Sequence, residues 1–389
     1  MRRPTWTTHT PTMSIGNHHC RLFFGETLTD FEPITKDQRD EVGDTLWRHL
    51  FSQGFLVERV RHRSFIQIVL SLLLLTLLMG SSIGSGAVGL PKEQSIIGIL
   101  QRSQRVLWIG AHPDDENSSG GLIARAKDTS GALFMVSLTR GENSDIVWGG
   151  LCRGSQIGRA RAALFAQSAA LFRADGYELG PFINGPHSLE ELDRQCPPGA
   201  PFRGWPPTTT SDEVITKWRR EGDPVKYIVA ILRRYRPQVV LAMDRYCGVS
   251  GNPEHIAVAR LLLEAIPLAA DAQSYPGTGN PWQVEHVIFS AHVIPPLIQC
   301  HYCKCEGQEP QQPVQDVSAL DRSRLHDMTY FRVSCLVAKT YQNTMQQRGW
   351  SESQIQALCA QAERDALRAY QQGIRTYPLV EPYRLYPVQ

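Results

Sequence analysis

The sequence predicts a three-layer α/β fold, Rossmann-like in the loose sense, with a mostly parallel central sheet. Beyond residue 88, short continuously apolar runs alternate with longer stretches of helical periodicity. Parallel strands need crossover connections, which are usually helices, and they are buried on both faces. The composition, 42% apolar and 20% charged over 389 residues, is that of a globular protein and excludes a disordered or collagen-like chain.

The apolar runs have the length and the side-chain types of buried strands. These predicted strands are residues 105–109, 132–138, 238–243 and 284–290. The predicted helices are residues 120–128, 156–173, 223–235, 254–265 and 351–371. Two stretches, the proline-rich 193–212 and the Gln-, Cys- and Pro-rich 300–318, interrupt the alternation and are predicted to be loop insertions in a domain that covers residues 88–389.

One segment departs from the globular composition of the rest of the chain. Residues 64–87 contain no charged side chain, and the leucine-rich run at 65–83 follows a basic flank and ends in small residues. That pattern is typical of a signal peptide, and the run is also long enough for a single membrane anchor. A buried core helix is the alternative. Residues 1–63 stay an unassigned N-terminal extension, and we expect the remainder to be secreted or to lie in the cell envelope or a lumen.

Charge and cysteine content narrow the choice of partners and compartment. The net charge is +2, with no basic surplus, so we expect no nucleic-acid partner. Of the nine cysteines only Cys20 precedes the apolar run, and the even number that follows favours disulfides in an oxidising compartment. The cluster CHYCKC at 300–305 could instead hold zinc, but it lacks a second, well-spaced pair of ligands.

Residues able to carry chemistry follow the first predicted strand, where the chain reads GAHPDDE at 110–116. Open parallel sheets place their ligands at the carboxyl ends of the strands. His112 and Asp115 are three residues apart, and a tight loop begun by Pro113 could turn both toward one metal ion. Asp114 would then lie beside the water on that ion, close enough to accept its proton.

A third ligand is expected from another strand end, because catalytic zinc commonly has three protein ligands and one water. His255 stands at the start of a predicted helix, after the strand at 238–243 and a glycine-rich loop. We therefore predict that His112, Asp115 and His255 bind a divalent ion, Zn²⁺ or alternatively Fe²⁺. Asp114 remains as the general base.

The hexapeptide AHPDDE at 111–116 resembles the hallmark of the LmbE-like, PIG-L type zinc-dependent de-N-acetylases, which include N-acetylglucosaminyl-phosphatidylinositol de-N-acetylases. Further stretches match this family in the same order along the chain: TRGE at 139–142, RPQVVL at 236–241 and GVSGNPEH at 248–255. The resemblance implies hydrolysis of the N-acetyl group of an N-acetylglucosamine-type glycan or glycolipid. It also implies His112, Asp115 and His255 as metal ligands and Asp114 as general base.

The resemblance further implies substrate contacts by Arg161 and Ser119. Asn252 stands where the family often has a histidine, and it can donate a hydrogen bond to substrate but no proton. Two residues are therefore candidates for the general acid: Asp114, which would accept a proton and later return it, and His292. Leu164 stands where the family arginine usually has a glutamate partner, which leaves Arg161 without that partner.

Two alternatives to this deacetylase remain. Asn252 motivates a non-catalytic, glycan-binding relative that kept the pocket and lost a proton donor. The same metal could also serve an amidase that acts on another acylated amine. The motif HExxH is absent from the sequence, and GxSxG does not occur in the predicted domain at 88–389, which argues against an ordinary metalloprotease or an α/β-hydrolase.

Overall fold

The structure is a computed structural model and describes residues 95–144, 148, 150–195, 203–291 and 304–388. The predicted N-terminal extension and the apolar segment 64–87 lie outside these residues. Among the helices that are described, none combines the length and the apolarity needed to cross a bilayer.

The core of the fold is a seven-stranded sheet with the order β3-β2-β1-β4-β5-β7-β6. Its strands are β1 (Arg105–Gly110), β2 (Ala132–Thr139), β3 (Gly176–Phe182), β4 (Val239–Met243), β5 (His286–Ser290), β6 (Val314–Ser318) and β7 (Val380–Pro387). Strands β1 to β5 are parallel to one another, and β7 runs antiparallel to both β5 and β6. The predicted mostly parallel sheet is confirmed.

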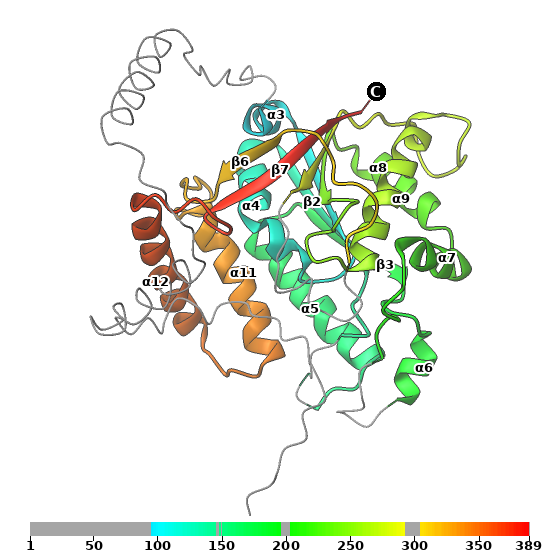
Figure 1. Cartoon of the computed structure of the whole chain (residues 1–389), viewed down its shortest axis with the longest axis horizontal. Helices are drawn as coiled ribbons and strands as arrows, with labels where there is room; N and C mark the ends of the chain where they lie inside the picture. The colour runs from blue at the N-terminus through cyan, green and yellow to red at the C-terminus, as the bar shows by residue number, and fades with distance from the viewer. Residues whose placement is uncertain (1–94, 145–147, 149, 196–202, 292–303, 389) are drawn as a thin grey trace, which may run out of the picture. The chain divides into compact units, whose positions relative to one another are not determined.

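Helices cover both faces of the sheet, as Figure 1 shows. On one side lie α4 (Gly120–Thr129), α5 (Ser155–Leu171) and α11 (Tyr330–Met345), and on the other α7 (Ser211–Glu221), α8 (Pro224–Tyr235) and α9 (Pro253–Ala270). The remaining helical elements are α3 (Ile96–Arg102), η2 (Asp115–Ser119), α6 (Leu189–Arg194) and α12 (Glu352–Gln371).

Strand β1 shows how the sequence produces the three layers. Val106 and Trp108 pack in the hydrophobic cluster with α4, α5 and α11, whereas Leu107 and Ile109 pack in the cluster with α7, α8 and α9. Successive side chains of a strand point to opposite faces, so a strand buried on both faces is apolar at every position. This is why β1 could be recognised as a continuous apolar run.

The strand order reverses at β1, which pairs with β2 on one side and with β4 on the other. The crossover after β1 runs through α4 on one face of the sheet, and the crossover after β4 runs through α9 on the other face. Ligands of open α/β sheets bind at such a switch point. The loops that follow β1 and β4 are the two that contain the predicted metal ligands.

Part of the predicted loop at 300–318 is wrong, because residues 314–318 form strand β6. The sequence VQDVS of this strand is polar and only partly buried, since it lies at the edge of the sheet and pairs with β7 alone. Residues 304–313 carry no helix or strand, as expected. In the other predicted insertion, 193–212, residues 203–210 are irregular, and α7 begins at Ser211.

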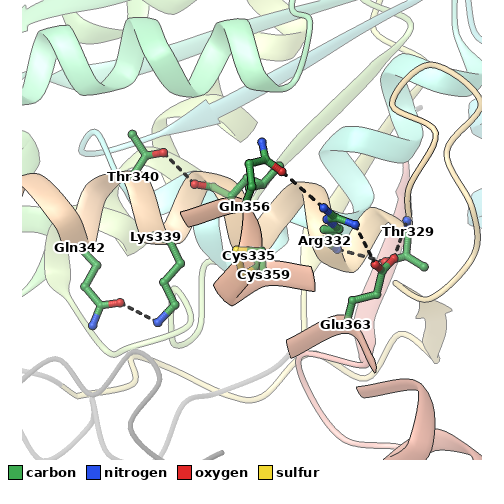
Figure 2. The surroundings of a disulfide bond; sticks show 10 residues. Thr329, Arg332, Cys335, Lys339, Thr340, Gln342, Gln356, Cys359 and Glu363 are labelled. Atoms are coloured by element: carbon green, nitrogen blue, oxygen red, sulfur yellow. Dashed lines mark hydrogen bonds and ion pairs between the residues drawn. A yellow bond between two sulfur atoms is a disulfide. The ribbon is translucent and has the colours of Figure 1, made fainter. Parts of the chain in front are cut away.

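Disulfides fasten two regions of the described chain. Cys335 of α11 bonds to Cys359 of α12, and an ion pair of 3.4 Å between Arg332 and Glu363 lies beside this bond (Figure 2). The second disulfide joins Cys247, in the loop after β4, to Cys305. The expected disulfides are thus confirmed, and Cys305 is engaged in one of them rather than in a zinc cluster.

The buried carboxylate of Glu381 in β7 is expected to be important for stability. It accepts hydrogen bonds from the Gly121 and Leu122 amides at the start of α4, at 2.9 and 2.8 Å. Glu381→Ala leaves both buried amides without an acceptor, so the free energy of unfolding should fall by about 2–4 kcal/mol. Urea denaturation followed by circular dichroism measures this, with Glu190→Ala at an exposed ion pair as the control. Equal midpoints for the two variants would contradict the assignment.

Candidate metal centre

Three buried side chains meet where β1 and β4 end. His112 lies in the loop after β1, Asp115 is the first residue of η2, and His255 lies in the first turn of α9. Helix α9 can begin here because the Asn252 side chain caps its first turn, accepting from the Glu254 amide, and Pro253 occupies the first helical position.

The ligand atoms of these residues face one another. His112 Nδ1 and His255 Nε2 are 3.1 Å apart, and Asp115 Oδ1 lies 3.1 Å from His255 Nε2 and 3.5 Å from His112 Nδ1. The structure thus brings together the three residues that the sequence suggested as metal ligands, although His255 is 143 residues from His112.

This arrangement fits a divalent cation. Tetrahedral Zn²⁺ with bonds of ~2.0–2.2 Å holds its ligand atoms roughly 3.3–3.6 Å apart, close to the separations seen here. Burial lowers the pKa of His112, but the carboxylates of Asp115 and Glu254 outweigh it and raise that pKa to about 10. Positive charge is therefore strongly favoured between these side chains, and a shared metal ion can supply it in place of a proton.

The first turn after β1 orients Asp115. Its Oδ2 accepts hydrogen bonds from the Ala111 and His112 amides, both at 2.8 Å, which leaves Oδ1 directed at the two histidines. Burial raises the pKa of Asp115, yet His255 and His112 hold it well below its ordinary value. Asp115 is therefore an anion that can offer one oxygen to a metal.

The loop after β4 orients His255. Its Nδ1 lies 2.9 Å from the Gly248 carbonyl, so the tautomer that donates there leaves Nε2 free of its proton and available to a metal. Gly248 has a φ of +49°, and a Cβ at this position would lie 2.6 Å from the His255 Cβ. A side chain here would displace the ligand.

A disulfide restrains the loop after β4. Cys247 is bonded to Cys305, and the neighbouring amides of Lys304 and Glu306 donate to the carbonyls of Gly251 and Tyr246 at 2.9 and 2.7 Å. The segment at 304–306 therefore fastens both sides of the turn that contains Gly248.

Glu254 is a functional residue that the sequence analysis missed. Its fully buried carboxylate contacts His112 Nε2 and accepts from the Gly185 amide at 2.7 Å and from Trp205 Nε1 at 3.0 Å. Burial raises the pKa of Glu254, but His112 outweighs this effect and lowers it to about 2. A carboxylate behind a histidine ligand fixes the ring and increases its basicity. Its place beside His255 in NPEH was the available signal.

Asp114 lies next to the three residues but has a different environment. Its side chain is 24% exposed and forms an ion pair of 2.6 Å with Arg161 of α5. Arg161 also donates to the carbonyls of Pro113 and Gly141. Arg161 therefore has an acidic partner despite Leu164, and its direct contact in the structure is with the predicted general base.

The other predicted site residues have structural contacts here. Asn252 caps α9, and Ser119 is buried at the end of η2, where its hydroxyl interacts with Tyr383. Neither has a described contact with the three clustered residues, so their substrate contacts stay predictions. His292 lies outside the described residues.

Comparison with known proteins gives one family. Residues 107–266 match the PIG-L family model, described as GlcNAc-PI de-N-acetylase. The chain is similar to 1D-myo-inositol 2-acetamido-2-deoxy-alpha-D-glucopyranoside deacetylases of Geodermatophilus obscurus (30% identity, 48% of this chain and 60% of the relative) and Frankia alni (32%, 46% and 58%). A similar deacetylase of Saccharopolyspora erythraea is 29% identical over 57% of this chain and 77% of its own length. For the first two relatives, the match spans about 60% of their length.

We expect His255→Ala to abolish stoichiometric metal binding, because two of three ligands hold a divalent ion weakly. Elemental analysis after dialysis against trace Zn²⁺ measures this. His286→Ala is the matched control, since His286 begins β5 and lies at the opposite end of the strands from the cluster. Equal metal content in the two variants would refute the site.

Glu254→Gln should weaken metal affinity by about 10- to 100-fold while leaving the three ligands in place. The amide keeps an acceptor for Gly185 but loses the charge behind His112. Competition with a chromophoric chelator measures the dissociation constant, and circular dichroism checks the fold. An unchanged affinity would show that Glu254 only packs against His112.

Proposed function

Because residues 107–266 belong to the PIG-L/LmbE-like de-N-acetylase family, we propose that the chain is a metal-dependent hydrolase of an N-acetylated amino sugar. One observation carries the proposal: His112, Asp115 and His255 converge within 3.5 Å of one another, next to the partly exposed carboxylate of Asp114. Three ligands with an adjacent base are the components that hydrolysis of an amide by a metal ion requires.

The substrate class follows from the family and the relatives. The names of the similar proteins describe deacetylation of a 2-acetamido-glucopyranoside joined to myo-inositol. We take an N-acetylglucosamine unit, free in a small molecule or carried by a glycolipid, as the substrate, with an inositol glycoside as the first compound to test.

The metal is taken to be zinc. Two imidazoles and one carboxylate form a usual catalytic zinc set, and the same donors accept Fe²⁺ as the alternative. When bound, the ion lowers the pKa of a water and polarises the amide carbonyl.

The protein's own residues then move the protons. Asp114 accepts a proton from the attacking water, and Arg161 holds the carboxylate in place at 2.6 Å. Asp114 returns that proton to the nitrogen as the C–N bond breaks, so that acetate and a free amino sugar leave. Asn252 supports this double use of Asp114 because an amide side chain has no acidic proton to give to the leaving nitrogen. Its Oδ1 instead caps α9 by accepting from the Glu254 amide.

An oxidising compartment, secreted or within the cell envelope or a lumen, is part of the proposal. The disulfides Cys247–Cys305 and Cys335–Cys359 support it, since such bonds are rare where thiols are kept reduced. Membrane attachment through residues 65–83 stays a prediction from the sequence.

Asp114→Asn should retain the metal and lower deacetylation by ~10²–10⁴-fold, because the amide cannot accept the proton. Acetate release from the inositol glycoside, from chitooligosaccharides and from acylated amines, with metal content measured in parallel, tests this. Unchanged turnover would remove the mechanism. Sugar binding without acetate release by the wild-type chain would instead favour a non-catalytic module, and preference for acylated amines would favour the other amidase.

A further inference from the structure

We propose that Glu116 and Tyr341 are positioning residues for Asp114, a role that rests on the proposed function of that carboxylate. They hold the main chain of Asp114 in an unusual conformation, and so fix where its side chain lies relative to the metal ligand Asp115. Neither residue has an assigned role in the steps described above.

The backbone of Asp114 is the first observation. Its φ is +104°, a region that side-chain-bearing residues rarely occupy. The six other non-glycine residues with positive φ in the described part of the chain have values between +48° and +67°, within the ordinary left-handed region. Such a conformation persists only where the surroundings impose it.

Glu116 supplies the contact that imposes it. Its Oε2 accepts a hydrogen bond of 2.9 Å from the Asp114 amide, and its Oε1 accepts one of 2.8 Å from the Tyr341 hydroxyl. Glu116 is fully buried and Tyr341 is 3% exposed. The Tyr341 hydroxyl, 225 residues away on α11, therefore fixes the carboxylate that in turn fixes the Asp114 amide.

Asp114 is thus held at two points. Glu116 holds its main chain, whereas Arg161 holds its side chain at 2.6 Å. The metal ligands depend on other contacts: Asp115 on the Ala111 and His112 amides, His112 on Glu254, and His255 on the Gly248 carbonyl. Loss of the Glu116 contact should therefore displace the Asp114 carboxylate and leave metal binding unchanged.

The test compares variants of the full chain loaded with Zn²⁺. Glu116→Ala and Tyr341→Phe should lower kcat about 10- to 100-fold and leave KM and metal content unchanged, as expected for a misplaced catalytic group. Glu116→Gln should restore most of kcat, because its amide oxygen can accept from the Asp114 amide. Tyr330→Phe is the matched control, since Tyr330 lies on the same helix, is buried, and donates 2.9 Å to Asp128 instead.

The rate of hydrogen exchange at the Asp114 amide, measured on the peptide that contains it, tests the proposal without enzymatic turnover. Tyr341→Phe and Glu116→Ala should speed exchange of the Asp114 amide, and Tyr330→Phe should not. If the Glu116→Ala chain fails to fold, Tyr341→Phe still decides. Loss of metal in step with kcat, an equal effect of Tyr330→Phe, or unchanged exchange would overturn the positioning role. A wild-type chain that releases no acetate refutes the proposed function, and the exchange comparison then decides the positioning role alone.

Discussion

The carboxylate of Asp115 connects the end of β1 to both imidazoles of the cluster, and the geometry of the centre depends on it. One oxygen accepts from two main-chain amides of the turn after β1, and the other faces His112 and His255. Burying this anion is unfavourable unless donors and opposite charge surround it. The turn supplies the donors, and a cation bound between the three side chains would supply the charge.

Around this carboxylate the fold arranges a second layer of support from distant segments. Glu254 steadies His112, the loop after β4 steadies His255, and α11 reaches Glu116 through Tyr341. The contacts of Glu254 with His112 and of Tyr341 with Glu116 join segments that are far apart in the sequence, whereas His255 and Gly248 both follow β4. The sheet order therefore determines which residues can support the site, as well as which can bind the metal.

The sequence allowed the parallel core and the three clustered residues to be predicted for a physical reason. Strands buried on both faces, such as β1 and β4, are apolar throughout, and the residues that follow them must lie at one edge of the sheet. Strands β3 and β6 at the sheet edges are only partly buried and lack that signal. Tyr341 was missed because its contact with Glu116 is set by helix packing, which local patterns do not encode. Glu254 was missed although it stands next to His255, because its contact with His112 depends on how α9 packs against the loop after β1. The Asp114–Arg161 pair was missed for the same reason.

The disulfide beside the loop after β4 has a practical consequence. Cys247 precedes Gly248, whose carbonyl orients His255, so the bond to Cys305 restrains the backbone next to this ligand. Recombinant material made in a bacterial cytosol, where glutathione and thioredoxin keep thiols reduced, would lack that restraint. Preparations from oxidising and reducing hosts therefore need to be compared by thiol titration before their metal contents are interpreted.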